Sequence, residues 1–274
     1  MDQEEVNYLD GATRLEKNPL SNIKDLIIVP CHASFKAEVD IVPVDLGSDA
    51  NWALFDYQKG EVKFYLEHIS KAIEMLEDNK GSLVVFSGSC TRVDGGEWSE
   101  AETYHRIALT ECFRRWGMSD PSKYNEITSR MRKDVWALDS FENMLGSLCE
   151  FKNAIGDNPR HVTVVGWKFK EERIKIHMDA LKFPMERFSY VGVNNPIDMG
   201  GAIKGEARAI SQFENNIYGA GGNLGEKRRN RNRGGKTNCF EELVPEMTGF
   251  IEYMYNPENG NTPYNGDVDW ESGL

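Results

Sequence analysis

Long hydrophobic runs are missing from this 274-residue sequence. No apolar stretch approaches the roughly 18 residues of a membrane-spanning helix, and residues 1–5 have neither the basic nor the apolar region of a secretory signal peptide. Cysteine is also scarce: the five cysteines are widely spaced without a Cys-x-x-Cys pair, which argues against zinc or redox motifs. We therefore expect a soluble protein of the cytoplasm, a reducing compartment.

Positive charge is in the minority. Lys and Arg total 32 against 44 Asp and Glu, a formal net charge of −12. Such a surface repels nucleic acid, so nucleic acid is a disfavoured partner and any anion site has to be local. His68 and His105 lie in expected helices without metal-ligand spacing to a partner, and we predict no metal site. The Gly-x-Gly-x-x-Gly fingerprint of dinucleotide-binding folds is absent as well.

What the sequence does contain is an alternation of short apolar runs and segments with helical periodicity. Each run is continuously apolar, as strands buried on both faces of a parallel sheet are. We expect strands at 26–29, 83–86, 161–165 and 188–193, helices at about 60–78, from 99 onward, at 139–155, 170–181 and 242–255, and a candidate short strand at 126–128. This order predicts an α/β fold, a Rossmann-like three-layer sandwich with a mostly parallel sheet.

Composition divides the chain into three parts. Residues 1–22 form a polar N-terminal leader, residues 23–198 carry the alternation of the α/β domain, and residues 199–274 form a C-terminal extension. In this extension glycine and asparagine surround the basic tract 227–233, which favours a solvated loop, and residues 256–274 have the composition of a polar tail.

The expected strands stop abruptly at small or polar residues. The first is followed by Pro30-Cys31-His32, the second by Ser87-Gly88-Ser89, and the third by Gly166-Trp167-Lys168. Ligands of open parallel sheets bind outside the carboxyl ends of the strands. These residues therefore predict a single ligand pocket.

The segment after the second strand has features of an anion site. Gly88 lets the backbone approach a ligand, and the free amides of a helix beginning at Ser99 and Glu100 hold phosphate or carboxylate groups. Arg92 lies in the connecting loop. The alternative is an ordinary turn followed by a capping box, in which Ser99 and Glu102 each bond the other's backbone amide.

Residues 139–143 place two carboxylates, a hydroxyl and an amide in the first turn of a helix. Ser140 or Asn143, if it faces the strand ends, would hydrogen-bond a ligand. Asp139 and Glu142 also have the spacing of a capping box, which is the structural alternative. A nucleophilic role for Ser140 is not expected, because the sequence indicates no adjacent base.

A basic cluster of Lys168, Lys170 and Arg173 follows the strand at 161–165, near a helix start where the helix dipole disfavours cations. This predicts a bound anion, which Arg173 would hold in a bidentate manner; the alternative is a solvated basic face.

His32 is the histidine best placed for acid–base chemistry, although a hydrogen bond to a backbone carbonyl is the simpler role. Cys31 beside it suits a small buried residue.

These same motifs resemble the YdcF-like family, which includes SanA and ElyC, over about residues 26–193. Ser87-Gly88-Ser89 stands for the family's Ser-Gly-Gly, Ser99-Glu100-Ala101 for its Ser/Thr-Glu-Ala, and residues 139–143 for its Asn-Thr-x-Glu-Asn. Lys170 to Arg173 keeps the arginine of His-Met-x-Arg but has lysine in place of the histidine. The resemblance implies a Rossmann-like fold and, from a bacterial relative, S-adenosylmethionine as a ligand. Residues 57–61 and the tail are similar to a fungal branch of uncharacterised members.

Three functions follow from these patterns. The leading one is binding of a small anionic or nucleotide-like ligand, with S-adenosylmethionine as a candidate, by Ser87, Gly88, Arg92, Ser99, Glu100, Ser140, Asn143, Lys170 and Arg173. The second is a hydrolase or transferase of a phosphorylated or glycosylated small molecule, with His32 as acid or base assisted by Asp139 or Glu142. The third is a nonenzymatic module that engages RNA or a protein through residues 227–233. The oligomeric state stays open.

Overall fold

The computed structural model describes residues 20–39, 41–232 and 240–271. Most of the leader expected at 1–22 lies outside these ranges, as does Arg233 of the basic tract. Across the described residues, no helix combines the length and the apolar character that a membrane crossing requires.

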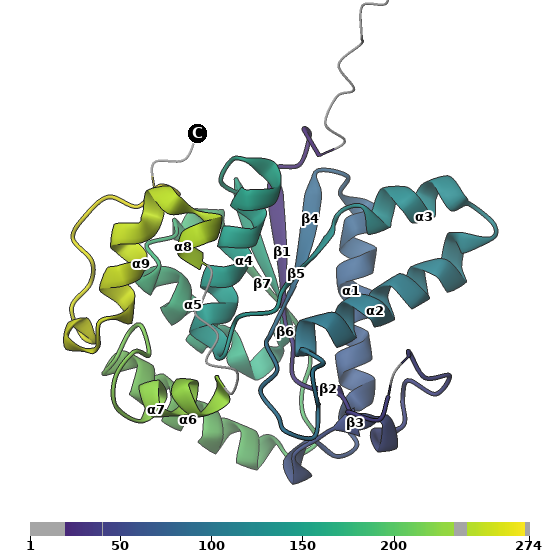
Figure 1. Cartoon of the computed structure of the whole chain (residues 1–274), viewed down its shortest axis with the longest axis horizontal. Helices are drawn as coiled ribbons and strands as arrows, with labels where there is room; N and C mark the ends of the chain where they lie inside the picture. Colours follow the sequence, from purple (N-terminus) through teal and green to yellow (C-terminus); the bar gives the residue numbers. More distant parts are fainter. Residues whose placement is uncertain (1–19, 40, 233–239, 272–274) are drawn as a thin grey trace, which may run out of the picture.

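The centre of the molecule is a five-stranded sheet in which every neighbouring pair is parallel (Figure 1). Its strands are β1 (Asp25–Pro30), β4 (Ser82–Ser87), β5 (Met131–Asp134), β6 (His161–Trp167) and β7 (Phe188–Asn194), in the spatial order β5-β4-β1-β6-β7. Strands β1 and β4 are almost wholly buried, which explains why they are continuously apolar. A small antiparallel pair, β2 (Ser34–Phe35) and β3 (Trp52–Ala53), lies apart from this sheet.

Helices cover both faces of the sheet, which confirms the expected α/β three-layer sandwich. One face carries α1 (Val62–Asp78) and α2 (Glu100–Cys112), with α3 (Pro121–Thr128) against them. The other carries α4 (Ser140–Ile155) and α5 (Glu171–Ala180). Two apolar cores result, one on each side of the sheet.

The chain reverses its direction of travel across the sheet between β1 and β6. From β1 it moves outward through β4 to β5, then returns to β6 on the other side of β1 and continues to β7. The helices that follow β1 and β6 therefore leave on opposite faces of the sheet. A crevice opens at the carboxyl ends of strands where the order reverses in this way, and ligands of such sheets commonly bind there.

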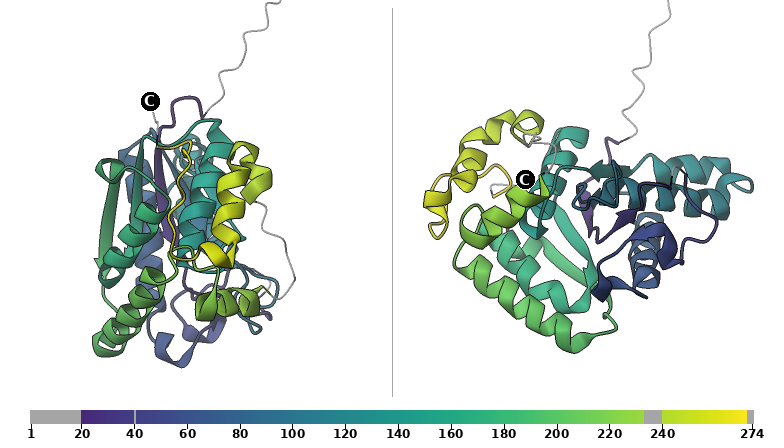
Figure 2. Two further views of the ribbon diagram at one scale, coloured as in Figure 1. Left: turned by 90° about the vertical axis from the view of Figure 1, so that its left-hand side faces the viewer. Right: turned by 60° about the horizontal axis from the view of Figure 1, so that its bottom comes forward.

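The C-terminal part of the chain packs against the α4 and α5 side of the domain (Figures 1 and 2). It contains α6 (Met199–Glu214), α7 (Gly222–Arg231), α8 (Phe240–Leu243) and α9 (Thr248–Tyr255). Helices α6 and α7 lie below the carboxyl edge of the sheet in Figure 1. Trp270, within the expected polar tail, is fully buried and donates its indole N–H to the Leu181 carbonyl at 2.7 Å. This part of the chain therefore contributes to the main core.

Three local predictions were wrong. Residues 126–128 end α3, and the strand comes later, at 131–134. Residues 227–231 belong to helix α7 and not to a loop, because Arg228 is held inside the protein by acidic partners. The helix expected at 242–255 is divided into α8 and α9, since Pro245 cannot supply the N–H that a continuous helix needs.

Candidate functional site

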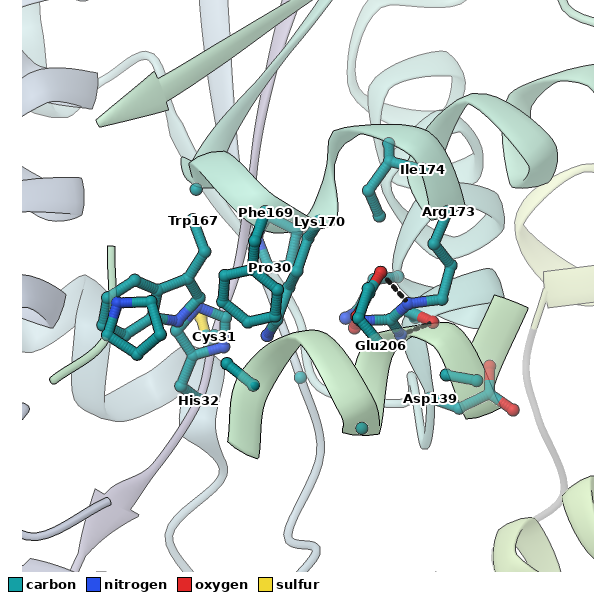
Figure 3. A pocket seen from close by; sticks show the side chains of 18 of the residues that line it. Pro30, Cys31, His32, Asp139, Trp167, Phe169, Lys170, Arg173, Ile174 and Glu206 are labelled. Atoms are coloured by element: carbon teal, nitrogen blue, oxygen red, sulfur yellow. Dashed lines mark hydrogen bonds and ion pairs between the residues drawn. The ribbon is translucent and has the colours of Figure 1, made fainter. Parts of the chain in front are cut away.

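A cavity of about 620 Å³ lies at the reversal point of the sheet, beside α6 (Figure 3). The ends of β1 and β6 provide His32 and Trp167, and α6 provides Glu206. Of the residues predicted from the sequence, the cavity is lined by His32, Gly88, Glu100, Asp139, Ser140, Asn143, Lys170 and Arg173. The strand-end pocket is therefore present, with most of its expected residues around it.

Ser87 and Ser99, also predicted to bind the ligand, have structural roles outside the cavity lining. Ser99 is the N-cap of α2 and forms the capping box with Glu102: its hydroxyl accepts from the Glu102 amide at 2.9 Å. Ser87 is buried behind the cavity wall, with its hydroxyl 2.7 Å from Asp134 Oδ2 and 3.0 Å from Asn143 Oδ1. It therefore helps to orient Asn143, which does line the cavity.

Arg92 does not line the cavity either. Its guanidinium donates two hydrogen bonds to Asp94, each 2.8 Å long, and lies 4.0 Å above the centre of the Phe55 ring. This geometry fixes the loop after β4, and the charge of Arg92 is already compensated by Asp94.

Arg173 reaches the cavity but is occupied by protein groups. It donates to both carboxylate oxygens of Glu206 at 2.8 and 2.9 Å, and to Ser140 Oγ at 2.7 Å. Both side chains of the ion pair are largely buried. The pair fastens α6 to the start of α5, so the charge that was expected to hold an anion is neutralised by a residue from the C-terminal extension.

Ser140 has the adjacent base that the sequence did not indicate. Its hydroxyl lies 2.8 Å from Nε2 of His177, which is fully buried on α5. Burial, followed by the Arg173 charge, lowers the pKa of His177 to about 3. An imidazole that resists protonation this strongly is a weak base, so the contact favours a structural role over nucleophilic catalysis.

Asp139 and Glu142 are bound to Arg228 of α7. Asp139 caps α4 through the amides of residues 141 and 142, and its other oxygen accepts from Arg228 at 2.8 and 2.9 Å. Burial favours the neutral acid, but the charge of Arg228 keeps the pKa of Asp139 below its usual value. Glu142 lies 3.1 Å from Arg228 and accepts from the Leu138 amide, so the expected reciprocal capping box is not formed. Both carboxylates are therefore held by Arg228.

Three cations in the cavity lining form no ion pair among the described residues. Among the described residues, the amine of Lys170 has no ion pair or hydrogen bond, and burial, then the Arg173 charge, lowers its pKa to about 7. Lys227 and Arg231 from α7 line the same cavity. Arg231 donates to the Leu138 carbonyl at 2.6 Å, and its charge acts on Glu100 without a direct ion pair.

Two carboxylates, Glu61 and Glu100, line the same cavity and interact electrostatically with Lys170. Thr91 donates to one oxygen of Glu100 at 2.5 Å, and burial raises the pKa of both acids. The Glu100 carboxylate packs on Gly88, where a Cβ would lie 3.0 Å from its oxygen, and the φ of +154° also favours glycine. Gly88 is therefore required for the position of Glu100.

His32 lies between aromatic rings at the end of β1. Its ring stacks on Trp167 with 5.9 Å between centroids, and its Nε2 is buried without a hydrogen-bond partner among the described residues. Burial, and then the nearby Lys170 charge, lowers the pKa of His32 well below its usual value. A neutral imidazole with an unsatisfied nitrogen is free to bond a ligand in the cavity.

Sequence reasoning missed the cavity residues that come from the connecting segments and the extension: Glu61, Glu206, Lys227 and Arg231. Asp198, which caps α6, and the helical repeat of Ala202, Ala209 and Phe213 were available as signals for that helix. The basic charges of α7 were expected to be solvated, which holds for the exposed Lys227 and Arg229 but not for the buried Arg228. In the described part of the chain, no group of three or more His, Cys, Asp or Glu side chains is arranged to hold a metal ion.

Comparisons with known proteins give one relative in yeast. The chain is 26% identical over 266 residues to "Uncharacterized protein YOR238W" of Saccharomyces cerevisiae, an alignment that covers 80% of this chain and 87% of that protein. No family model matches the chain, and no solved structure matches it. The relative therefore shares most of the length of the chain.

Proposed function

We propose that this protein binds a small anionic, nucleotide-like molecule in the cavity at the reversal point of its sheet. The observation that carries this proposal is the Lys170 amine, which lines the cavity without an acidic partner among the described residues. Lys227 and Arg231 add positive charge to the same lining. Phosphate or carboxylate groups are the ligands that such a group of cations holds.

The rest of the lining suits the other parts of such a molecule. Glu61 and Glu100 are able to accept hydrogen bonds from sugar hydroxyls, as carboxylates do in dinucleotide-binding folds. Tyr65, Trp167 and Phe169 supply flat apolar walls. The volume of about 620 Å³ falls in the range of small-molecule sites. The resemblance to the YdcF-like family makes S-adenosylmethionine one candidate, with its carboxylate at the cations and its positive groups at the carboxylates.

The contacts favour this function over the alternatives. Asp139 and Glu142, which would assist His32 in a hydrolase or transferase, are held by Arg228. Within the basic tract, Arg228 is buried between its acidic partners, and Lys227 and Arg231 line the cavity although Lys227 is also exposed to solvent, so two of these cations are accessible to a ligand in the cavity.

Thermal melts with a panel of ligands test the proposal. ADP, glucose 6-phosphate, S-adenosylmethionine and inorganic phosphate are added to the wild type, to Lys170→Met and to Lys168→Met. Lys168 is the matched control, because it lies in the same turn, is exposed and does not line the cavity. We expect a saturable rise in Tm with at least one anion that Lys170→Met reduces and Lys168→Met keeps. A flat response across the panel, or an equal response in both variants, would refute it.

A further inference from the structure

The position of Lys170 is unusual for a lysine. It ends the 3₁₀ turn Lys168–Lys170 between β6 and α5, and in Figure 3 its side chain extends into the cavity toward His32. Its Nζ lies 5.7 Å from the centre of the Phe169 ring, and no described carboxylate is within ion-pair distance. Arg173, the nearest strong charge on α5, has the same sign.

Burial and the Arg173 charge favour the uncharged amine, and together they outweigh the opposing charges of Glu206, Glu100 and Glu61. Burial and the Arg173 charge both lower the pKa of Lys170, to about 7, so roughly half of the molecules carry a neutral amine at pH 7. An ordinary exposed lysine is about 99.9% protonated at that pH and is a poor nucleophile. A desolvated lysine beside another cation is the arrangement in which lysine amines attack carbonyl groups.

We propose that Lys170 is a nucleophilic amine that forms an imine with a small aldehyde or ketone bearing a phosphate or carboxylate group. This inference rests on the proposed function, because Lys227 and Arg231 hold the anionic group while the carbonyl carbon meets the amine. The ligand class is thus narrowed to anionic carbonyl compounds such as 2-oxo acids and phosphorylated aldehydes.

The step balances without an oxidant or a cofactor. The lone pair of Nζ forms a bond to the carbonyl carbon, and the carbonyl π electrons move to oxygen. The amine nitrogen loses its two protons, and the hydroxyl group formed from the carbonyl oxygen leaves as water. A C=N bond remains, and the two hydrogens of the water balance those lost by the amine. Glu100, whose pKa burial raises, lines the same cavity and is able to donate the proton to the departing hydroxyl.

Trapping with a reductant tests this step directly. The wild type is incubated at pH 7.5 with glyoxylate, an aldehyde that carries a carboxylate, and sodium borohydride is added. The hydride adds to the imine carbon and leaves a stable carboxymethyl amine, which peptide mass mapping locates. Lys168 serves as the reference within the same molecule, since it is exposed and lies two residues away.

We expect carboxymethylation of Lys170 at least about tenfold faster than that of Lys168, as the larger neutral fraction implies. Inorganic phosphate should compete with glyoxylate and slow the labelling of Lys170 alone. The folded Lys170→Met protein, checked by circular dichroism, should lose the fast phase. Equal labelling of the two lysines, or a fast phase that persists in Lys170→Met, would overturn the inference.

The result also separates this inference from the proposed function. If ADP or phosphate stabilises the wild type through Lys170 but glyoxylate labels no lysine preferentially, the anion site stands and the imine step is refuted. If the anions have no effect and no preferential labelling occurs, both proposals fail.

Discussion

Anion binding in the cavity should weaken as the pH rises from 7 to 9. Burial, followed by the Arg173 charge, lowers the pKa of the Lys170 amine to about 7 in the free protein. A bound phosphate or carboxylate stabilises the ammonium form and raises this pKa again. Above pH 7 the complex therefore holds more protons than the free protein, and its formation becomes less favourable with each step in pH.

The size of the effect follows from the pKa. Each pH unit well above it corresponds to about 1.4 kcal/mol, or a tenfold change in Kd. Between pH 7 and pH 9 the largest expected loss is about 50-fold, because half of the Lys170 amines are already neutral at pH 7. Other charged or titratable groups face the same amine and require a control: His32, Glu61, Glu100, Arg173 and Glu206.

Isothermal titration calorimetry at pH 7, 8 and 9 measures this dependence, with ADP or the most effective anion of the melting panel. Buffers of different ionisation enthalpy report the uptake of protons on binding. Wild type and Lys168→Met should lose affinity with pH and take up a proton, whereas Lys170→Met should bind weakly and with a much smaller slope. An equal slope in Lys170→Met would show that another group titrates and would refute the reasoning.

Three further changes test the ion pairs and the turn after β4. Arg228→Met leaves Asp139 and Glu142 buried beside each other without their cation, and urea unfolding should show a loss of about 3–5 kcal/mol at pH 7; a loss below about 1 kcal/mol would contradict the network. Glu206→Gln removes the carboxylate that neutralises Arg173, so calorimetry should show tighter anion binding while Tm falls. Unchanged affinity would mean that Arg173 does not act on the ligand. Gly88→Ala places a methyl group 3.0 Å from the Glu100 oxygen at a φ of +154°, and denaturant unfolding should show a loss of about 1–3 kcal/mol. Gly249→Ala, whose Cβ meets no atom within 4 Å, should be neutral or stabilising, and an equal loss there would contradict the argument.

The central strands could be predicted from the sequence because burial on both faces of a parallel sheet demands continuous apolar residues. Strand β5 could not be recognised in this way. It is an edge strand of four residues, Met131–Asp134, and three of these residues have ionisable side chains. Only its hydrogen bonds to β4 define it as a strand. Its polar character is what an edge position permits.

The strand-end half of the site was predictable for a related reason. Strand ends in a parallel sheet converge, so His32, Gly88 and Lys170 had to lie near one another once the strands were recognised. The roles of the charged groups were not predictable, since they depend on partners far away in the sequence. The guanidinium of Arg173 is able to bind an anion, but in the structure it is paired with the Glu206 carboxylate.

In helix α7 the spacing of the residues determines which side chains are buried and which line the cavity. Lys227 and Arg231 are four residues apart, and Leu224 precedes Arg228 by the same interval, so a helix places a basic face beside a buried one. The buried face directs Arg228 to Asp139 and Glu142, where its charge stabilises the start of α4. Once that contact is made, Lys227 and Arg231 are carried to the cavity lining. One arginine of the tract thus serves the fold, and because it does, its neighbours become available for a ligand.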